Sequence, residues 1–288
     1  MNAIELKQLN KKMRNFKLKD INLKIPKGYI TGFIGENGSG KTTLINHLIG
    51  LKKEDSGTIE LLGFEDIESN RVELLNRIGI VFSEDNFPQK ETAVSLEKTL
   101  KMFYKNWNSD QFYQYLKRFG VETSSKIARL STGEKVKLSI AAALSHEAEL
   151  LILDEPTSNL DPTFRIEFLE LLQELMMDEE MTILFSTHIT SDLEHIADYI
   201  VMIDDGEILF NMELETLTET YKKVKGPFEV LDDEIKELLI GVKTSSLGFQ
   251  AMTKESRILE ELFGSKVLIE PVTIDEVMYY IKHQKRGG

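Results

Sequence analysis

The sequence predicts an α/β protein whose core is a mostly parallel β-sheet, and three observations lead to this fold class. First, short apolar runs typical of buried strands recur along the chain, at residues 29–34, 78–82, 150–153, 182–185 and 199–203. Second, helical periodicity separates several of them, at residues 42–49, 162–178 and 190–197. Third, polar residues directly follow several runs, and an open parallel sheet binds its ligands beyond the carboxyl ends of its strands.

An antiparallel β part is expected at the N-terminus. Residues 3–34 contain short alternating segments, of which 21–25 has the clearest period of two. A proline-glycine turn at residues 26–28 then leads into the first core strand. We expect the strand at residues 58–62, like the one at 78–82, to join the core sheet.

A helical insert is predicted at about residues 83–145, where the pattern changes to helical periodicity. Its segment 103–119 is rich in aromatic residues. Aromatic side chains at helical spacing usually pack in a core, so a small helical subdomain is one interpretation. An exposed groove that docks a partner is the other, and the pattern does not choose between them.

The last part of the chain, residues 211–288, is predicted to be a small α/β appendage to a main domain at 1–210, with a dimerisation or regulatory role. Its expected helices and short strands alternate, with helices at 212–223, 232–240, 254–263 and 273–283 and strands at 228–231 and 266–270.

Composition excludes several classes of protein. The 48 acidic residues outnumber the 35 basic ones, which argues against nonspecific nucleic-acid binding through bulk charge. The absence of cysteine excludes a disulfide framework and a cysteine-rich metal site. The apolar runs are far shorter than the roughly 18 residues that a membrane span needs, and the N-terminus lacks the apolar core of a signal peptide.

A phosphate-binding loop follows the first core strand, because the motif G-x-x-x-x-G-K-[ST] is matched at every position. The residues are Gly35, Glu36, Asn37, Gly38, Ser39, Gly40, Lys41, Thr42 and Thr43. A strand, loop and helix in this order direct backbone N–H groups and a helix N-terminus at one anion. Lys41 is expected to reach the β- and γ-phosphates of a nucleotide, and the Thr42 hydroxyl to ligate Mg²⁺.

Two further segments carry groups suited to nucleotide chemistry. The apolar run 150–153 ends in Asp154 and Glu155, of which the first is expected to hold Mg²⁺ and the second to orient and deprotonate the attacking water. Ser131, Thr132 and Gly133 open a helix and form a second candidate anion site with no obvious use inside one chain.

Taken together, the motifs resemble those of the nucleotide-binding subunit of ABC transporters. They are GENGSGKT as Walker A, LSTGE as the signature, LLILDE as Walker B, residues 158–161 as the D-loop and His188 as the switch histidine. The resemblance covers about residues 1–210 and implies an ABC-type P-loop NTPase that binds ATP and Mg²⁺. It also implies a head-to-tail homodimer in which the Ser131 hydroxyl, the Gly133 backbone and the helix N-terminus behind them touch the γ-phosphate of the ATP held by the other subunit. Glu134 and Asp161 are further residues that it implies for nucleotide binding. His188 is then placed to sense the γ-phosphate.

The chain departs from the family pattern at three places. LSTGE replaces the commoner LSGGQ but retains Ser131 and Gly133. The glutamine that usually follows the strand at 78–82 is replaced by Ser83, and either Ser83, as a metal contact, or Glu84 is expected to stand in for it. The aromatic residue that stacks on adenine is replaced by Met13, with Phe16 close by, which predicts looser discrimination between bases.

Within the family, the chain is similar to the ATPase subunits of ABC-2-type exporters, in particular exporters of phenol-soluble modulins and antimicrobial peptides. This implies a peripheral protein at the cytoplasmic face of the membrane, bound to a separate integral-membrane permease that selects the substrate, and no nucleic-acid partner. Two alternatives stay open: a soluble ABC-type ATPase that acts on ribosomes or DNA, and an ATP-binding regulatory module. An ATPase assay distinguishes the regulatory module, which would bind ATP without hydrolysing it, from the exporter subunit and the soluble ATPase.

Overall fold

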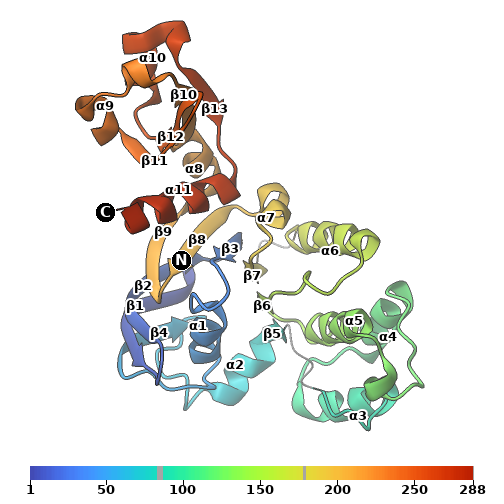
Figure 1. Ribbon diagram of the computed structural model, residues 1–288. Coiled ribbons are helices and arrows are strands. Elements are labelled where there is room, and N and C mark those ends of the chain that lie inside the picture. Colours follow the sequence, from blue (N-terminus) through green and yellow to red (C-terminus); the bar gives the residue numbers. More distant parts are fainter. Residues whose placement is uncertain (83–86, 178–179, 288) are drawn as a thin grey trace. The chain divides into compact units, whose positions relative to one another are not determined.

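The computed structural model describes residues 1–82, 87–177 and 180–287 (Figure 1). The chain divides into two units, Met1–Asn211 and Met212–Gly288, here called unit 1 and unit 2.

The core sheet of unit 1 has the strand order β5-β6-β7-β3-β8-β9. Its strands are β3 (Ile30–Ile34), β5 (Ile78–Val81), β6 (Leu150–Asp154), β7 (Thr182–Thr187), β8 (Tyr199–Asp204) and β9 (Glu207–Glu213). The pairs β5–β6, β6–β7, β7–β3 and β3–β8 are all parallel. Every residue of β3 and β6 is buried, as expected for central parallel strands covered on both faces. The predicted fold class is therefore confirmed.

A second, antiparallel sheet in unit 1 has the order β2-β1-β4, with strands β1 (Asn2–Lys12), β2 (Lys17–Pro26) and β4 (Ser56–Leu61). The expectation that residues 58–62 join the core sheet was wrong. β4 pairs with β1, with Ile4 opposite Leu61 and Leu6 opposite Ile59. Glu60 lies between the buried Ile59 and Leu61, and a strand with one apolar and one polar face suits a sheet buried on a single side.

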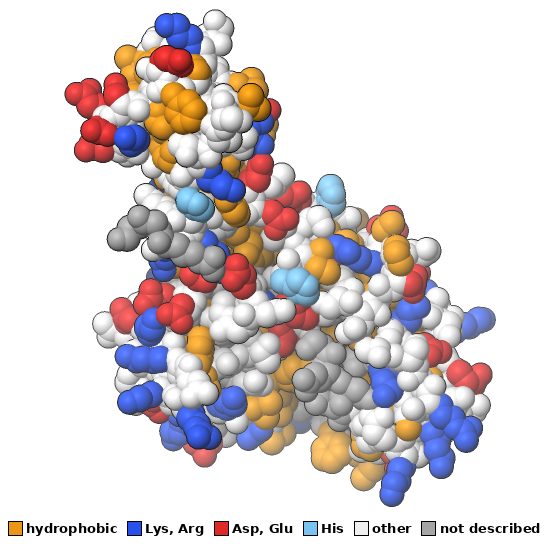
Figure 2. Space-filling view, in the orientation of Figure 1, with side chains coloured by type: hydrophobic (Ala, Val, Ile, Leu, Met, Phe, Trp, Pro, Cys, Tyr) orange, Lys and Arg blue, Asp and Glu red, His pale blue; other side chains and the backbone are white. Residues whose placement is uncertain are grey.

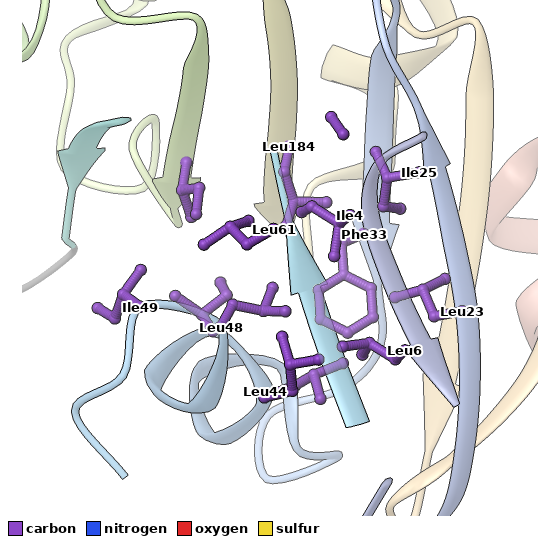
Figure 3. Packing of buried hydrophobic residues seen from close by; sticks show 14 of the residues in the cluster. Ile4, Leu6, Leu23, Ile25, Phe33, Leu44, Leu48, Ile49, Leu61 and Leu184 are labelled. Atoms are coloured by element: carbon purple, nitrogen blue, oxygen red, sulfur yellow. The ribbon is translucent and has the colours of Figure 1, made fainter. Parts of the chain in front are cut away.

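The core of unit 1 joins the two sheets through helix α1 (Lys41–Leu48). Figure 3 shows Leu44 and Leu48 of α1 beside Phe33 of β3 and Leu6 of β1. Each of these side chains is at most 1% exposed. Burial of an aliphatic or aromatic side chain contributes roughly 1.5–3 kcal/mol. This packing fixes α1, and with it the start of the phosphate loop, against both sheets.

The remaining helices of unit 1 are α2 (Arg71–Arg77), α3 (Ala93–Phe103), α4 (Ser109–Arg118), the 3₁₀ turn Ile127–Arg129, α5 (Thr132–Ala143), α6 (Pro162–Leu175) and α7 (Thr190–Ile196). Several begin where a polar side chain accepts a hydrogen bond from a first-turn N–H group, namely at Thr92, Asn108, Ser131 and Asp161.

The aromatic segment 103–119 is divided between core and surface. Phe112 and Phe119 are 0% and 4% exposed, and the Phe119 ring meets that of Phe164 in α6 with centroids 5.0 Å apart. At the end of α3, in contrast, Met102 and Phe103 are 83% and 71% exposed. Core packing thus accounts for Phe112 and Phe119, whereas the end of α3 presents an apolar surface.

Unit 2 contains an antiparallel sheet with the order β11-β12-β10-β13. Its elements are α8 (Leu214–Thr220), β10 (Lys222–Gly226), the 3₁₀ turn Phe228–Val230, α9 (Asp233–Glu237), β11 (Leu239–Ser245), β12 (Gly248–Thr253), α10 (Ser256–Phe263), the 3₁₀ turn Gly264–Lys266, β13 (Leu268–Pro271) and α11 (Ile274–Gly287).

Three expected elements of unit 2 were wrong, and one hairpin was missed. The helix predicted at 212–223 ends at Thr220, residues 228–231 form no strand, and the helix predicted at 232–240 ends at Glu237, before β11. The missed hairpin is that of β11 and β12. The hairpin was hidden because β11 contains a register shift between Ile240 and Lys243, at Gly241 with φ 65°. Such a bulge breaks the period of two by which a strand is recognised.

Candidate functional site

The phosphate loop connects the end of β3 to the first residue of α1. Its left-handed glycines, Gly38 with φ 84° and Gly40 with φ 116°, adopt a backbone that other residues rarely reach. A Cβ atom on Gly40 would lie 2.7 Å from the Phe16 ring. Gly40 is also the N-cap of α1 and has no side chain to cap it, so the first turn keeps N–H groups for an anion.

The interior of the loop fits a bound phosphate group. The Ser39 hydroxyl is buried and has no hydrogen-bond partner among the described residues. The Lys41 ammonium, on a side chain only 5% exposed, donates to the carbonyl oxygens of Gly35 at 2.6 Å and Glu36 at 3.4 Å. Asn37 and Thr42 are exposed and Thr43 is half-buried. A fixed ammonium beside uncapped N–H groups is suited to phosphate oxygens.

Asp154, the last residue of β6, lies beside the loop. Its carboxylate accepts hydrogen bonds from the Thr42 hydroxyl at 2.9 Å and the Ser186 hydroxyl at 3.0 Å. Burial raises the pKa of Asp154 above its ordinary value, the two hydroxyls oppose this, and the nearby charge of Glu155 adds to it. Thr42 and Asp154 fit a magnesium ion, because hydroxyl and carboxylate oxygens are the hard ligands that Mg²⁺ takes.

Asp154→Asn is expected to stabilise the protein in the absence of Mg²⁺ and nucleotide. Because the folded-state pKa is raised, the ionised carboxylate costs the folded protein stability, and this cost grows as pH rises from the ordinary value of 3.8 to the folded-state pKa. The asparagine amide can still hydrogen-bond both hydroxyls. We expect Tm to increase by a few degrees at pH 7, since each kcal/mol in the free energy of unfolding changes Tm by roughly 2–4 °C. This increase should become smaller as pH is lowered.

Thermal unfolding at pH 7 and pH 5 measures this effect, with the exposed Glu170→Gln as a control for removal of a surface charge. In the wild type, ATP with Mg²⁺ should raise Tm more than ATP alone, and Asp154→Asn should lose this difference. A lower Tm for Asp154→Asn than for the wild type at pH 7 would contradict the assignment of a destabilising buried charge.

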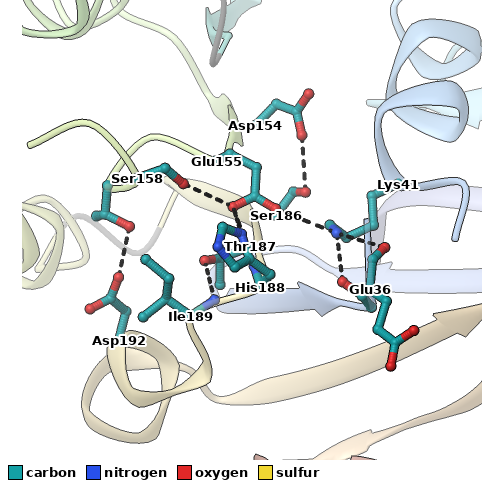
Figure 4. Close-up of polar contacts among 12 residues, drawn as sticks. Glu36, Lys41, Asp154, Glu155, Ser158, Ser186, Thr187, His188, Ile189 and Asp192 are labelled. Carbon is teal, nitrogen blue, oxygen red and sulfur yellow. Dashed lines mark hydrogen bonds and ion pairs between the residues drawn. The ribbon is translucent and has the colours of Figure 1, made fainter. Parts of the chain in front are cut away.

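Glu155 follows β6 with a left-handed backbone of φ 53°, which is strained for a residue other than glycine. Its Oε2 accepts hydrogen bonds from the Ser158 hydroxyl at 3.1 Å and from His188, through the backbone N–H at 3.3 Å and ring Nδ1 at 2.7 Å (Figure 4). Its Oε1 is buried and lies 3.4 Å from the Lys41 ammonium without an aligned hydrogen bond. The carboxylate therefore joins two loops and faces the phosphate loop.

Ser131, Gly133 and Glu134 lie at the start of α5. The Ser131 hydroxyl accepts from the Glu134 N–H at 3.2 Å and donates to the Glu134 carboxylate at 2.8 Å. The Ser131 N–H donates to the same carboxylate oxygen at 2.8 Å, and these hydrogen bonds lower the pKa of Glu134. The capping box that they form was missed, although Ser-x-x-Glu before a helix is its sequence signature. Asp161 likewise caps α6, accepting from the Phe164 N–H at 3.0 Å.

The predicted adenine contacts lie in the turn between β1 and β2, where the Met13 N–H donates to the Phe16 carbonyl at 2.8 Å. Both side chains are half-buried, and the Phe16 ring is the one that packs against Gly40. Ser83 and Glu84 lie outside the described residues. Ser186 was not identified as a site residue from the sequence. Its position, as a polar residue near the end of a buried strand, could have indicated that role.

Several known proteins are similar to this chain in sequence and in fold. Residues 18–158 match the ABC transporter family. The chain is 36% identical over 209 residues to the bacitracin transport ATP-binding protein BcrA of Bacillus licheniformis, covering 70% of this chain and 67% of BcrA. It is 32% identical over 212 residues to the ABC transporter ATP-binding protein NatA of Bacillus subtilis, covering 70% of this chain and 84% of NatA.

Among solved structures, the ATP-binding cassette MJ0796, in a dimeric post-hydrolysis state bound to ADP and Pi, superposes with a TM-score of 0.65 at 27% identity. The match covers 73% of this chain and 98% of that one. Three observations point to the same family: the sequence matches, the fold, and the meeting of the phosphate loop with Asp154, Glu155 and His188. The chain belongs to the ABC transporter family, as an ATP-binding subunit that hydrolyses ATP to drive transport.

Proposed function

We propose that this chain is the ATP-hydrolysing subunit of an exporter for peptides, such as amphipathic toxins of the phenol-soluble modulin kind, or for antimicrobial compounds. The observation that carries the ATPase part is the meeting of Lys41, Asp154 and Glu155 at the carboxyl ends of β3 and β6. The exporter part is supported by the likeness to BcrA, whose name describes bacitracin transport.

Each predicted site residue has a role in this proposal. The backbone N–H groups of residues 35–43 and the Lys41 ammonium bind the phosphates, and Thr42 and Asp154 hold Mg²⁺, which neutralises developing charge on the phosphate when bound. Glu155 accepts a proton from the attacking water, and His188 binds the γ-phosphate. Met13 and Phe16 contact adenine. Ser83 or Glu84, outside the described residues, replaces the missing glutamine.

We further propose that two copies close head to tail around two ATP molecules. Ser131, Gly133 and the N-terminus of α5 in one copy would then contact the nucleotide bound by the other, and Glu134 and Asp161 would complete the nucleotide site. Ser131 is exposed at the start of α5, and Gly133 is half-buried, so both are accessible to a second copy. The dimeric state of the MJ0796 cassette supports the association of two copies. Unit 2, where Ile258 and Leu262 of α10 are 42% and 61% exposed, would extend the dimer contact or regulate it.

The partner in this proposal is an integral-membrane permease, to which this chain binds at the cytoplasmic face of the membrane. Among the described residues, no helix has the length and apolar character needed to cross a bilayer. Figure 2 shows acidic and basic side chains intermixed over the visible face, in keeping with a net charge of −13 and with a partner other than nucleic acid. The exposed Met102 and Phe103 at the end of α3 are the proposed contact for the permease.

Affinity purification of the tagged protein from membranes in mild detergent tests the partner. We expect a multi-span membrane protein to co-purify in equal amount, and the double substitution Met102→Ser and Phe103→Ser to reduce its recovery by about tenfold. Met177→Ser is the matched control, because Met177 is 86% exposed elsewhere in unit 1. Recovery with ribosomes, with DNA or alone would instead favour a soluble ABC-type ATPase or a regulatory module.

A further inference from the structure

A buried carboxylate outside the groups named above connects the two loops that carry Glu155 and His188. Asp192 lies in the first turn of α7 and is 2% exposed. Its Oδ2 accepts a hydrogen bond from the Thr157 hydroxyl at 2.8 Å. Its Oδ1 accepts from Arg165 Nε at 2.7 Å and lies 2.6 Å from Arg165 Nη2. Its two partner residues therefore come from the loop after β6 and from α6.

These contacts lie on either side of one exposed segment in the sequence. Thr157 precedes the segment 158–161, which contains the exposed Ser158, Asn159 and Asp161, and Arg165 follows it on the first turns of α6. Since Thr157 is itself 2% exposed, water does not compete with its hydrogen bond to the carboxylate. Asp192 therefore anchors the segment at its start and beyond its end.

The same carboxylate is linked to the reacting groups on either side. Thr157 is two residues from Glu155 and precedes Ser158, which donates to Glu155 Oε2. Asp192 is four residues from His188, which contacts the same Oε2 atom. Figure 4 shows Ser158 beside the pair formed by Glu155 and His188, with Asp192 farther from this pair, below Ser158. The contact at Glu155 is open to solvent, with the His188 side chain 46% exposed, whereas the contact at Asp192 is buried.

We propose that Asp192 is a positioning residue for ATP hydrolysis, which acts through the Thr157 hydroxyl to fix the loop of Glu155 relative to the helix that follows His188. The inference rests on the proposed roles of Glu155 and His188. It assigns to Asp192 no contact with nucleotide. Arg165 balances the buried negative charge, so that the carboxylate stays a rigid acceptor.

Thr157→Val tests this inference, because it removes the hydroxyl and retains the shape of the side chain, whereas Asp192→Asn would leave the Arg165 guanidinium without its charge partner and risks misfolding. We expect kcat of the full-length protein to fall by about 10- to 100-fold, since a small misplacement of reacting groups has effects of this size. KM for ATP should stay within about twofold, as the phosphate contacts are unchanged. Thr157→Ser should restore most of the lost kcat.

Thr253→Val is the matched control. Thr253 is 0% exposed in unit 2, and its hydroxyl donates to the Leu238 carbonyl at 2.8 Å and accepts from the Glu255 N–H at 2.9 Å. We expect it to lower Tm at least as much as Thr157→Val does and to leave kcat unchanged. The inference is overturned if Thr157→Val keeps the wild-type kcat, or if Thr253→Val loses as much kcat as Thr157→Val. Wild-type turnover by Glu155→Gln would instead overturn the proposed role of Glu155, so the two failures can be told apart.

Discussion

Glu155→Gln is expected to lower the ATPase rate by roughly 100- to 10,000-fold, the range typical for loss of a general base, while ATP binding is retained. The amide oxygen can still accept the hydrogen bonds that His188 and Ser158 donate to Oε2, so the loop should keep its shape. The amide cannot accept the proton of the attacking water. The Lys41 ammonium, which lies 3.4 Å from Glu155 Oε1, keeps its contacts to the Gly35 and Glu36 carbonyls.

Two measurements check this result. Phosphate release reports turnover, and size-exclusion chromatography with ATP and Mg²⁺ reports association, which should be stable because the nucleotide is not consumed. Glu170→Gln, an exposed charge removal on α6, is the matched control and should behave as the wild type. If Glu155→Gln hydrolyses ATP at the wild-type rate, the base must be another group.

Ser131→Arg is expected to weaken ATP-dependent dimerisation by about 10- to 100-fold, because a large side chain in a close-packed contact typically costs 1–3 kcal/mol. Ser131 is exposed in the single chain, so the larger side chain is tolerated there. The variant also loses the capping box with Glu134, which typically lowers stability by ~1 kcal/mol. The dimerisation defect should greatly exceed what this loss of stability explains.

The measurement is made in the Glu155→Gln background, where the ATP-bound dimer persists. Ser131→Ala separates loss of the cap from steric obstruction, and Ser124→Arg places the same bulk on another exposed serine whose hydroxyl donates to a nearby glutamate, at 2.8 Å from Glu122. Undiminished dimerisation of Ser131→Arg would exclude Ser131 from the shared face and contradict the head-to-tail arrangement.

Several parts of the fold could be predicted because their signal is local. The strand Ile30–Ile34, the loop and the helix Lys41–Leu48 are contiguous, and their glycines and apolar pattern specify the backbone residue by residue. The strand Leu150–Asp154 and its terminal carboxylates are equally local. The assignment of β4 to the wrong sheet shows the limit, since its pattern identifies a strand but not the neighbour with which it pairs.

The amino-acid sequence alone predicted the α/β class, the phosphate loop, the acidic pair after β6 and the histidine after β7. The folded arrangement was needed to place Lys41 against Glu155, to turn Glu155 into a left-handed backbone and to join Asp192 with Thr157, 35 residues away in the sequence. The physical reason is that a motif depends on the conformation of adjacent residues, whereas a contact between distant ones depends on how complete strands and helices pack together.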